Sequence, residues 1–400
     1  MGFPPQCINA TTLTGACAVA GCSNGSAPVG AVEVVLGTTN LTAAATVACA
    51  SSTVHHAGTS HWTRVSIVAS DIGAAAHVRS LLQCCVTLPA CGRWSIGLHV
   101  LNLAPYPLLE AYGRTHAASV TNFMRFYLPA LLPMSDRAMW IDSDAIVLGD
   151  VARLLPRLFR NRHAEAALAQ VPRRARRAAN ISARPVGAWT ADELVQLGAA
   201  PADGAAAPDV PFNAGVLVLN LRAWRRRRIT SLLEDVARRL TARRPSSGAA
   251  GCQQFHTAVR LCGHSSQTPL NLVFADPSTT QELPAGWNYE ALGSPFSRRN
   301  AAMFVHKKYA SAVWRRSGGG QFRTKGFALP IPASAQVLHW NGKHKPWCRG
   351  VTPYNRIRRC RQARQTLPMC GEINLYAPDV LWRQFAPKRS GRVEIRVCYL

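Results

Sequence analysis

The sequence predicts an α/β fold in which one mainly parallel sheet is flanked by helices. From residue 62 onward, short apolar runs of strand length alternate with longer stretches whose apolar residues recur at helical spacing. This alternation is typical of a sheet that helices cover on both faces. The chain has 400 residues, 48% of them hydrophobic, which is enough for a sizeable core. Its length fits one large domain or two ordinary domains.

The predicted elements follow one another along the chain. Buried strands are expected at 64–70, 94–101, 139–141 and 212–220. Helical stretches are expected at 71–86, 120–132, 151–159 and from 221 onward. The second of these ends at Pro133, because proline cannot continue a helix.

Three stretches fall outside this pattern. Residues 1–61 are rich in Ala, Gly, Thr and Ser without a clear period, which predicts a low-complexity extension. Residues 171–209 mix Arg, Ala, Pro and Gly and are expected to form a surface insertion. Residues 348–400 form a basic tail that contains cysteines. The folded domain is therefore expected to span residues 62–347.

The formal net charge is +26, and Arg supplies far more of it than Lys. Such a balance favours polyanionic partners, namely nucleic acid, an anionic membrane surface or acidic glycans. The Arg residues are dispersed, and they are not interleaved with aromatic residues as a nucleic-acid-binding face requires. We therefore expect a solvated, Arg-rich surface and no nucleic-acid partner. Nucleic-acid binding remains an alternative that rests on charge alone.

The cysteines and glycosylation sequons indicate a cellular compartment. Thirteen cysteines occur without a CxxC pair, which argues against a zinc knuckle or a thioredoxin-like motif. Sequons begin at Asn9, Asn24, Asn40 and Asn180. Together they predict the lumen of the secretory pathway, with some disulfides. No run of 18 apolar residues and no signal peptide is visible, so membrane association is expected only through a segment outside this sequence.

The segment WIDSDAIVLGD, residues 140–150, carries the clearest chemical signal. Asp142 and Asp144 follow a predicted strand at spacing i and i+2, which sends both side chains to one face. Ligands of open α/β sheets bind at the carboxyl edge of the strands. Two carboxylates there form an oxygen site for a divalent cation that carries a diphosphate. The segment therefore predicts a sugar-nucleotide site.

Five motifs in order resemble family 8 of the retaining glycosyltransferases. They are IVASD at 67–71, RFYLPALLP at 125–133, the acidic segment at 140–150, FNAGVLVLNLRAW at 212–224 and HWNGKHKPW at 339–347. The likeness covers roughly residues 62–347 and is greatest to eukaryotic glycosyltransferase 8 domain-containing and galacturonosyltransferase-like proteins. It implies a GT-A fold, whose Rossmann-like sheet binds a nucleotide-sugar through a divalent metal, usually Mn²⁺.

The resemblance also implies a role for each matching residue around the metal and the diphosphate. Asp142, Asp144 and His339 are the expected metal ligands, and a set of carboxylates with one imidazole suits Mn²⁺. Gly342 is expected to let the backbone approach the diphosphate closely. Lys345 is expected to contact the same phosphates as a point charge.

Further matches concern the donor. Ala69 and Asp71 match contacts to uracil, although Asp71 could also merely cap the following helix. Asn213 and Ala214 match contacts to the donor sugar. Arg125 matches an arginine that reaches the phosphate or the donor sugar, and the alternative for Arg125 is an ordinary surface charge.

Gln267 matches the family residue nearest the anomeric carbon. Ser266 and Thr268 stand where the family has acids, so this sequence departs from the pattern on the acceptor side. An amide is a poor nucleophile. Same-face displacement, in which the leaving phosphate oxygen takes the acceptor proton, is therefore the favoured mechanism.

The expected function is that of a retaining glycosyltransferase. It would transfer a hexose or hexuronic acid from a UDP-sugar donor to a glycan or other hydroxyl acceptor, with a metal ion and an α-linkage in the product. The alternative is a catalytically degenerate GT-A protein that binds polyanionic glycans.

Overall fold

The computed structural model describes most of the sheet and its helices. The described residues are 11–15, 31–58, 61–84, 88–89, 93–106, 108–109, 117–172, 212–242, 266–289, 334–340, 385, 388–389 and 392–393.

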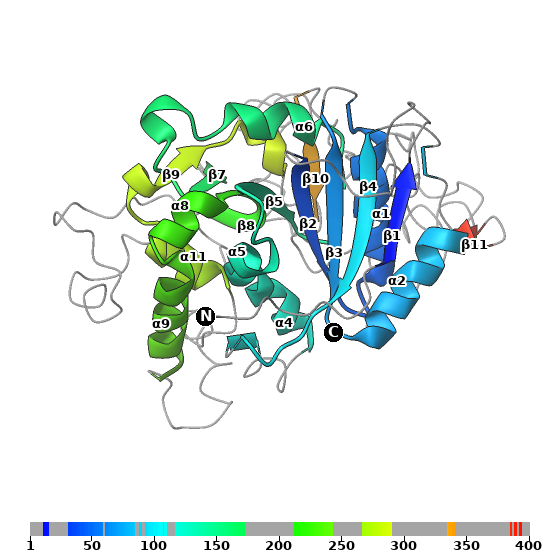
Figure 1. The fold of residues 1–400 in the computed structure, drawn as a ribbon, viewed down its shortest axis with the longest axis horizontal. Helices are drawn as coiled ribbons and strands as arrows, with labels where there is room; N and C mark the ends of the chain where they lie inside the picture. The colour runs from blue at the N-terminus through cyan, green and yellow to red at the C-terminus, as the bar shows by residue number, and fades with distance from the viewer. Residues whose placement is uncertain are drawn as a thin grey trace, which may run out of the picture.

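An eight-stranded sheet forms the centre of the molecule (Figure 1). Its strands are β1 (Thr11–Gly15), β2 (Val32–Thr38), β3 (Thr63–Ala69), β4 (Trp94–Val100), β5 (Arg137–Ile141), β7 (Leu168–Pro172), β8 (Phe212–Asn220) and β9 (Thr280–Glu282). Their order across the sheet is β1-β4-β3-β2-β5-β8-β7-β9. The central strands β4, β3, β2 and β5 are parallel, whereas β1 and β8 pair antiparallel with their neighbours. The predicted α/β class with a mainly parallel central sheet is confirmed.

Two short pairs of strands lie outside this sheet. β6 (Ala145–Val147) pairs antiparallel with β10 (Val337–His339), and β11 (Lys388–Arg389) pairs antiparallel with β12 (Arg392–Val393). The β6–β10 pair is the important one for function, because β6 directly follows the acidic turn at the end of β5.

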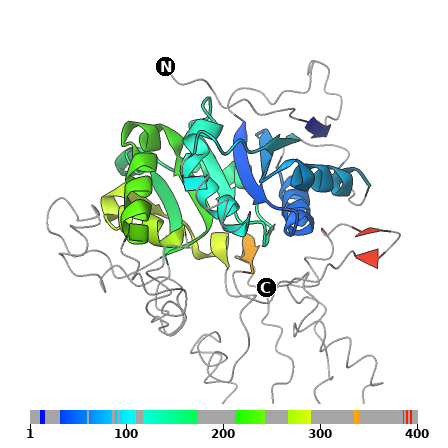
Figure 2. The ribbon, with the colours of Figure 1, turned by 90° about the horizontal axis from the view of Figure 1, so that it is seen from below.

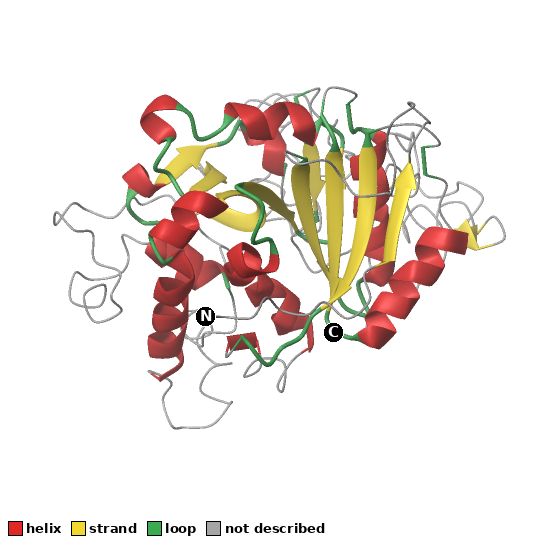
Figure 3. Cartoon of the chain, in the orientation of Figure 1, coloured by secondary structure: helices red, strands yellow, loops and turns green. Residues whose placement is uncertain are grey.

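Helices cover the sheet on both sides (Figure 3). The α-helices are α1 (Ala43–His55), α2 (Ile72–Cys84), α4 (Ala117–Met124), α5 (Leu128–Leu131), α6 (Val151–Leu154), α8 (Leu221–Arg226), α9 (Ile229–Ala242) and α11 (Gln267–Val273). Single 3-10 turns are η1 (Arg125–Tyr127), η2 (Leu155–Arg157), η3 (Asn161–His163), η6 (Pro277–Thr279) and η7 (Ala285–Asn288). Figure 2 shows α1 and α2 (blue) at one end of the molecule and α8 and α9 (green) at the other. Among the described helices, none has the length and apolarity that a bilayer crossing requires.

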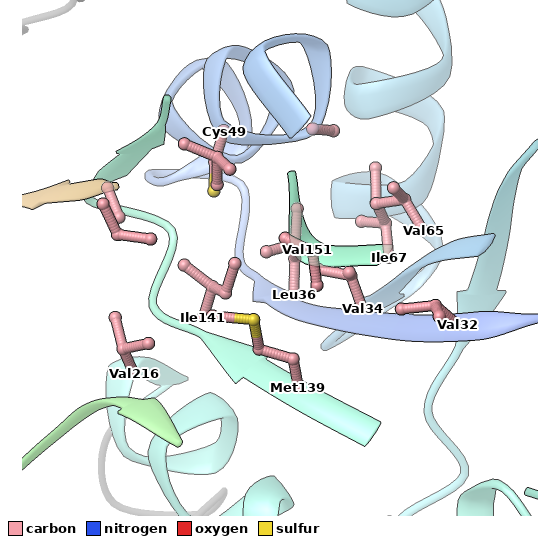
Figure 4. Packing of buried hydrophobic residues seen from close by; sticks show 14 of the residues in the cluster. Val32, Val34, Leu36, Cys49, Val65, Ile67, Met139, Ile141, Val151 and Val216 are labelled. Carbon is pink, nitrogen blue, oxygen red and sulfur yellow. The ribbon is translucent and has the colours of Figure 1, made fainter. Parts of the chain in front are cut away.

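Alternate residues of the central strands face two separate cores. Val34 and Leu36 of β2 point into a cluster with α1 and α2, together with Met139 of β5 (Figure 4). Val35 and Trp140 belong to the opposite cluster, which packs against α4, α8, α9 and α11. This follows from the two-residue period of a strand that is buried on both faces.

The strand order reverses beside β5. From β2 the chain proceeds to β3 and β4 on one side, then crosses to β5 on the other side of β2. Such a reversal of strand order is a topological switch point, and ligands of open α/β sheets bind there at the carboxyl ends of the strands. In the register of the pair, Leu36 lies opposite Ile141, so the end of β2 lies beside the start of the acidic turn.

The structure corrects the prediction for residues 1–61. Within that stretch, 32–38 form the central strand β2 and 43–55 form the core helix α1. All residues of β2 and nearly all of α1 are buried. An element buried on all sides shows no alternation of apolar and polar residues, and the small Ala, Ser and Thr side chains of α1 pack closely without a visible stripe.

The other predicted elements appear close to their expected positions. The strand predicted at 212–220 is β8, and the strand predicted at 64–70 is β3. The helix predicted at 120–132 is divided into α4, η1 and α5, with Pro129 in the first turn of α5. The predicted insertion at 171–209 and the basic tail at 348–400 lie almost entirely outside the described residues.

Candidate functional site

The acidic turn connects β5 to β6 at the switch point. The backbone N–H of Asp142 donates to the carbonyl oxygen of Gly215 on β8 at 2.7 Å, which fixes where the turn begins. The side chain of Asp142 is 26% exposed and that of Asp144 is 14% exposed. Both carboxylates therefore lie at the boundary between the core and the edge of the sheet, as the i and i+2 spacing predicts.

Strand pairing brings His339 to this turn from a distant part of the sequence. His339 lies opposite Ala145 in the β6–β10 ladder, and the backbone N–H of Trp340 donates to the carbonyl oxygen of Asp144 at 2.9 Å. As a result, Nε2 of His339 lies 3.2 Å from Oδ1 of Asp144 and 3.9 Å from Oδ2 of Asp142.

These three side chains can hold a metal ion. One ligand atom from each of Asp142, Asp144 and His339 lies within 4.8 Å of the others. The donor set combines two carboxylates, which suit hard cations, with one imidazole, which suits transition metals. Two negative charges beside a buried ring nitrogen also require a positive partner. The residues present therefore fit a divalent cation such as Mn²⁺.

Arg125 is buried against this turn and orients its first acid. Its guanidinium donates to Oδ1 of Asp142 at 3.1 Å, to the carbonyl oxygen of Ala214, and to the carbonyl oxygen of Asn122 at 2.8 Å. It also lies over the Trp140 ring, 4.9 Å from the centroid. Burial lowers the pKa of Arg125, and the carboxylate of Asp142 partly offsets this effect. The surface-charge alternative for Arg125 is wrong, because only 3% of the residue is exposed.

Two amides of α11 hold the start of β8. Nε2 of Gln267 donates to the carbonyl oxygen of Phe212 at 2.9 Å, and Oε1 of Gln267 accepts from the N–H of Ala214 at 3.4 Å. One turn later, Oδ1 of Asn271 accepts from the N–H of Phe212 at 2.9 Å. Gln267 therefore lies against the strand edge formed by Asn213 and Ala214, where the family resemblance places the donor sugar.

Asn288 links this strand edge to His339, and the sequence analysis missed it. Nδ2 of Asn288 lies 3.4 Å from the carbonyl oxygen of Asn213 and 3.3 Å from its Oδ1. Oδ1 of Asn288 lies 3.0 Å from Nδ1 of His339. No local pattern marks Asn288, because its partners Asn213 and His339 come from two distant parts of the chain.

Asp71 caps a helix at the end of β3. Its Oδ1 accepts from the N–H of Ala74 at 2.8 Å, and the hydroxyl of Ser70 donates to its Oδ2 at 2.7 Å. These bonds lower the pKa of Asp71, with the Ala74 contribution the largest. Capping does not exclude a contact with uracil. Ala69 and Asp71 nevertheless lie one strand beyond the switch point, because β2 separates β3 from β5.

The loop after β2 borders the switch point more directly. The N–H of Thr39 donates to Oγ1 of Thr42 at 2.9 Å, and Oδ1 of Asn40 lies 2.7 Å from Nδ1 of His77 on α2. The sequence analysis missed this loop because it assigned β2 to an extension. The apolar residues 34–36 were the available signal, although Glu33 precedes them. Gly342 and Lys345 lie outside the described residues.

Gly215 leaves room for the imidazole. A Cβ at this position would overlap atoms Cε1, Nε2 and Nδ1 of His339. We expect Gly215→Ala to displace the ring from Asp142 and Asp144 and to weaken Mn²⁺ binding by about tenfold or more, since overpacking costs about 1–3 kcal/mol. Calorimetric titration with Mn²⁺ measures the change.

Gly149→Ala is the matched control for this substitution. A Cβ there would meet the side chain of Gln336, which can move, and Gly149 touches none of the three candidate ligands. Its Mn²⁺ affinity should equal that of the wild type. Equal affinities for all three proteins would show that the close approach at Gly215 does not position His339.

Comparisons with known proteins agree with this geometry. The sequence model described as "Glycosyl transferase family 8" matches residues 100–350. "Glycosyltransferase 8 domain-containing protein 1" of Bos taurus is 28% identical over 234 residues, which cover 57% of this chain and 50% of the relative. "Glycosyltransferase 8 domain-containing protein 2" of Homo sapiens is 25% identical over 235 residues, which cover 56% of this chain and 53% of the relative. The chain thus spans about half the length of the curated relatives it matches.

The fold agrees as well. The solved structure "WbbM bifunctional glycosytransferase apo structure" superposes with a TM-score of 0.50 at 18% identity, covering 80% of this chain and 47% of that one. This likeness supports the GT-A fold and nothing finer. Because the family model matches more than half of the 400 residues and includes both acids and the distant histidine, the chain belongs to glycosyltransferase family 8.

Proposed function

We propose that this chain is a metal-dependent retaining glycosyltransferase. It transfers a hexose or hexuronic acid from a UDP-sugar to a hydroxyl group of a glycan or another acceptor and forms an α-linkage. The observation that carries the proposal is the convergence of Asp142, Asp144 and His339 within 4.8 Å at the switch point of the sheet. Membership of family 8 supports the same class of reaction.

We place the donor at the switch point, by the carboxyl ends of β2 and β5. Residues 38–40 border it on one side, and the base extends from there toward Asp71 at the end of β3. Asn213 and Ala214 at the start of β8 face the sugar. The diphosphate lies over the acidic turn. Because Asp142 and Asp144 are both carboxylates, a cation between them and the phosphates allows this placement.

Asp142, Asp144 and His339 hold this cation, for which Mn²⁺ is the proposed identity. When bound, it supplies a Lewis acid that stabilises negative charge on the departing diphosphate. Arg125 does not replace it, because its guanidinium is already engaged with Asn122, Ala214 and Asp142. The role of Arg125 is to orient the carboxylate of Asp142.

The protein supplies no carboxylate nucleophile at Gln267. Both ends of this amide are bound to the backbone of β8, which holds the side chain in one orientation beside the sugar position. We propose same-face displacement. The bond from the anomeric carbon to the phosphate oxygen breaks, the bond to the acceptor oxygen forms, and the leaving phosphate oxygen takes the acceptor proton. Retention of configuration follows from attack on the face that the leaving group vacates.

Lys345→Ala is expected to slow turnover. Lys345 contacts the phosphates in the proposed complex, and loss of one such donor to a developing oxyanion lowers the rate by about 100- to 1,000-fold. Steady-state kinetics with the preferred UDP-sugar measure kcat, and Lys307→Ala serves as a control for the loss of one lysine charge. An undiminished kcat in Lys345→Ala would remove this residue from the site.

The decisive test of the function is hydrolysis of a panel of UDP-sugars without an acceptor. A transferase should release UDP from one donor in the presence of Mn²⁺, and the release of UDP should stop when EDTA is added. A catalytically degenerate protein would bind polyanionic glycans and release no UDP from any donor. Linkage analysis of the product formed with an acceptor then decides between retention and inversion.

We also propose the Golgi lumen as the place of action, on the basis of the thirteen cysteines and four sequons. Expression in cultured animal cells followed by endoglycosidase treatment tests this proposal. A shift in electrophoretic mobility supports passage through the secretory pathway, and its absence contradicts the proposal.

A further inference from the structure

We propose that Asn288 is a positioning residue that sets the tautomer of His339. In this arrangement Nδ1 of the imidazole carries the proton, and Nε2 presents a lone pair to the two acids. The inference rests on the proposed function, because it concerns the same metal site. It adds a residue outside the acid–acid–histidine set and assigns it a specific chemical task.

A backbone N–H determines the direction of the hydrogen bonds. The N–H of Gly215 donates to Oδ1 of Asn213 at 2.8 Å, so this oxygen is an acceptor. Asn288 faces both that oxygen and the carbonyl oxygen of Asn213, at 3.3 and 3.4 Å. Two acceptors require the NH₂ end of the Asn288 amide. Its Oδ1 must therefore face Nδ1 of His339, which lies 3.0 Å away.

Burial prevents the opposite orientation. Asn213 is 7% exposed, Asn288 4% and His339 1%, so water does not satisfy these groups. A reversed Asn288 amide would place its oxygen against the two oxygens of Asn213. Each unpaired buried polar group costs about 1–3 kcal/mol. An acceptor at Nδ1 therefore selects the tautomer in which Nδ1 is protonated.

The backbone holds Asn288 in this place independently of the side chains. The N–H of Tyr289 donates to the carbonyl oxygen of Val337 at 2.9 Å, and the N–H of His339 donates to the carbonyl oxygen of Tyr289 at 3.0 Å. These bonds join the end of η7 to β10. The Asn288 amide therefore stays beside the imidazole whether or not a ligand is present.

The selected tautomer prepares the ring for a cation. With Nδ1 protonated, Nε2 has a lone pair, which lies 3.2 Å from Oδ1 of Asp144 and 3.9 Å from Oδ2 of Asp142. Three electron-rich atoms that face one another repel until a positive charge lies between them. Partners that orient a ligating histidine in this way typically change metal affinity by about 10- to 100-fold.

Nitrogen NMR of the metal-free protein tests the inference directly. Protein labelled with ¹⁵N at histidine is measured at a pH at which the His339 ring is neutral, and the His339→Gln variant assigns its signals. The wild type should show a protonated Nδ1 and an unprotonated Nε2. Asn288→Asp should keep this tautomer, because one carboxylate oxygen still accepts from Nδ1, although the other oxygen faces the two oxygens of Asn213 and should lower stability. Asn288→Leu should lose the preference.

Calorimetric titration with Mn²⁺ supplies the second measurement. Asn288→Leu should bind about 10- to 100-fold more weakly than the wild type, and Asn288→Asp should recover most of the affinity. Asn220→Leu is the matched control. It removes another buried amide from the far end of β8, about 23 Å from Asn213 at the rise of a strand. It should lower stability and leave both the tautomer and the Mn²⁺ affinity unchanged.

The outcomes separate this inference from the proposed function. Suppose that the wild-type protein binds Mn²⁺, but that its metal-free spectrum shows a protonated Nε2. That result would overturn the inference and leave the proposed function standing. The inference would also be overturned if Asn288→Leu kept both the tautomer and the Mn²⁺ affinity of the wild type. Equal losses of Mn²⁺ affinity in Asn288→Leu and Asn288→Asp would overturn it too, because a role in packing alone predicts that result. A wild type with the expected tautomer but no Mn²⁺ binding would overturn the proposed function and the positioning role together. The wild-type spectrum remains decisive even if Asn288→Leu does not fold.

Discussion

Asp144→Asn is expected to remove Mn²⁺-dependent UDP binding and to leave the fold intact. The Asp144 carboxylate lies 3.2 Å from Nε2 of His339, and an amide of the same size lacks the negative charge that a cation requires. We expect the Mn²⁺ affinity to fall at least about 100-fold, which corresponds to about 2.8 kcal/mol. The fold should persist because the backbone of Asp144 still accepts the hydrogen bond from Trp340 and the β6–β10 ladder remains.

Titration calorimetry with UDP in the presence and absence of Mn²⁺ measures this effect. Thermal unfolding of the metal-free protein checks that the fold is retained. Asp235→Asn is the control, since Asp235 is an exposed acid on α9 that pairs with Arg238. UDP binding with Mn²⁺ that is as tight in Asp144→Asn as in the wild type would remove Asp144 from the set of ligands.

Arg125→Met is expected to have the largest effect on stability. The substitution removes a buried cation together with its hydrogen bonds to the Ala214 carbonyl oxygen and the Asp142 carboxylate. Loss of one member of a buried pair costs about 3–5 kcal/mol. Asp142 keeps one donor, Nε1 of Trp140 at 2.7 Å from its Oδ1, but it loses its positively charged partner. Urea unfolding measures the change as a lower transition midpoint.

Arg226→Met provides the comparison for this substitution. Arg226 forms an exposed ion pair with Glu165 at 2.8 Å, and exposed pairs contribute about 0–1 kcal/mol. The two variants remove the same side chain from a buried and an exposed position. If the Arg125→Met variant were as stable as the wild type but had lost turnover, the main role of Arg125 would be direct contact with the donor, as the family resemblance implies. A large loss of stability identifies the structural support of Asp142.

Several elements could be predicted from the sequence because their signal is local. β8 contains the apolar run 214–219, and β3 ends in the apolar residues 67–69, which Ser70 and Asp71 follow. The acid pair at 142 and 144 follows β5 with a spacing that itself determines a common face. Local composition and period were sufficient in these places, because each element is bounded by polar residues.

β2 and α1 could not be recognised in the same way. Glu33 carries an acidic side chain in the buried strand β2, where Arg64 and Ser135 both contact its Oε1. Burial raises the pKa of Glu33, and the charge of Arg64 opposes that change. In the sequence, a buried acidic residue whose partner lies on another strand cannot be distinguished from an acidic residue that faces solvent. Only the neighbouring strands reveal that β2 is central.

The sequence by itself determined the strands β3, β4, β5 and β8, the acid pair and the family motifs that suggested His339. The tertiary structure alone decided that β2 creates the switch point, that the β6–β10 register brings His339 to Asp144, and that Asn288 joins His339 to Asn213. The physical reason is the range of the interactions. Periodicity and capping act between near neighbours, whereas the register of distant strands and the direction of buried hydrogen bonds depend on packing of the whole domain.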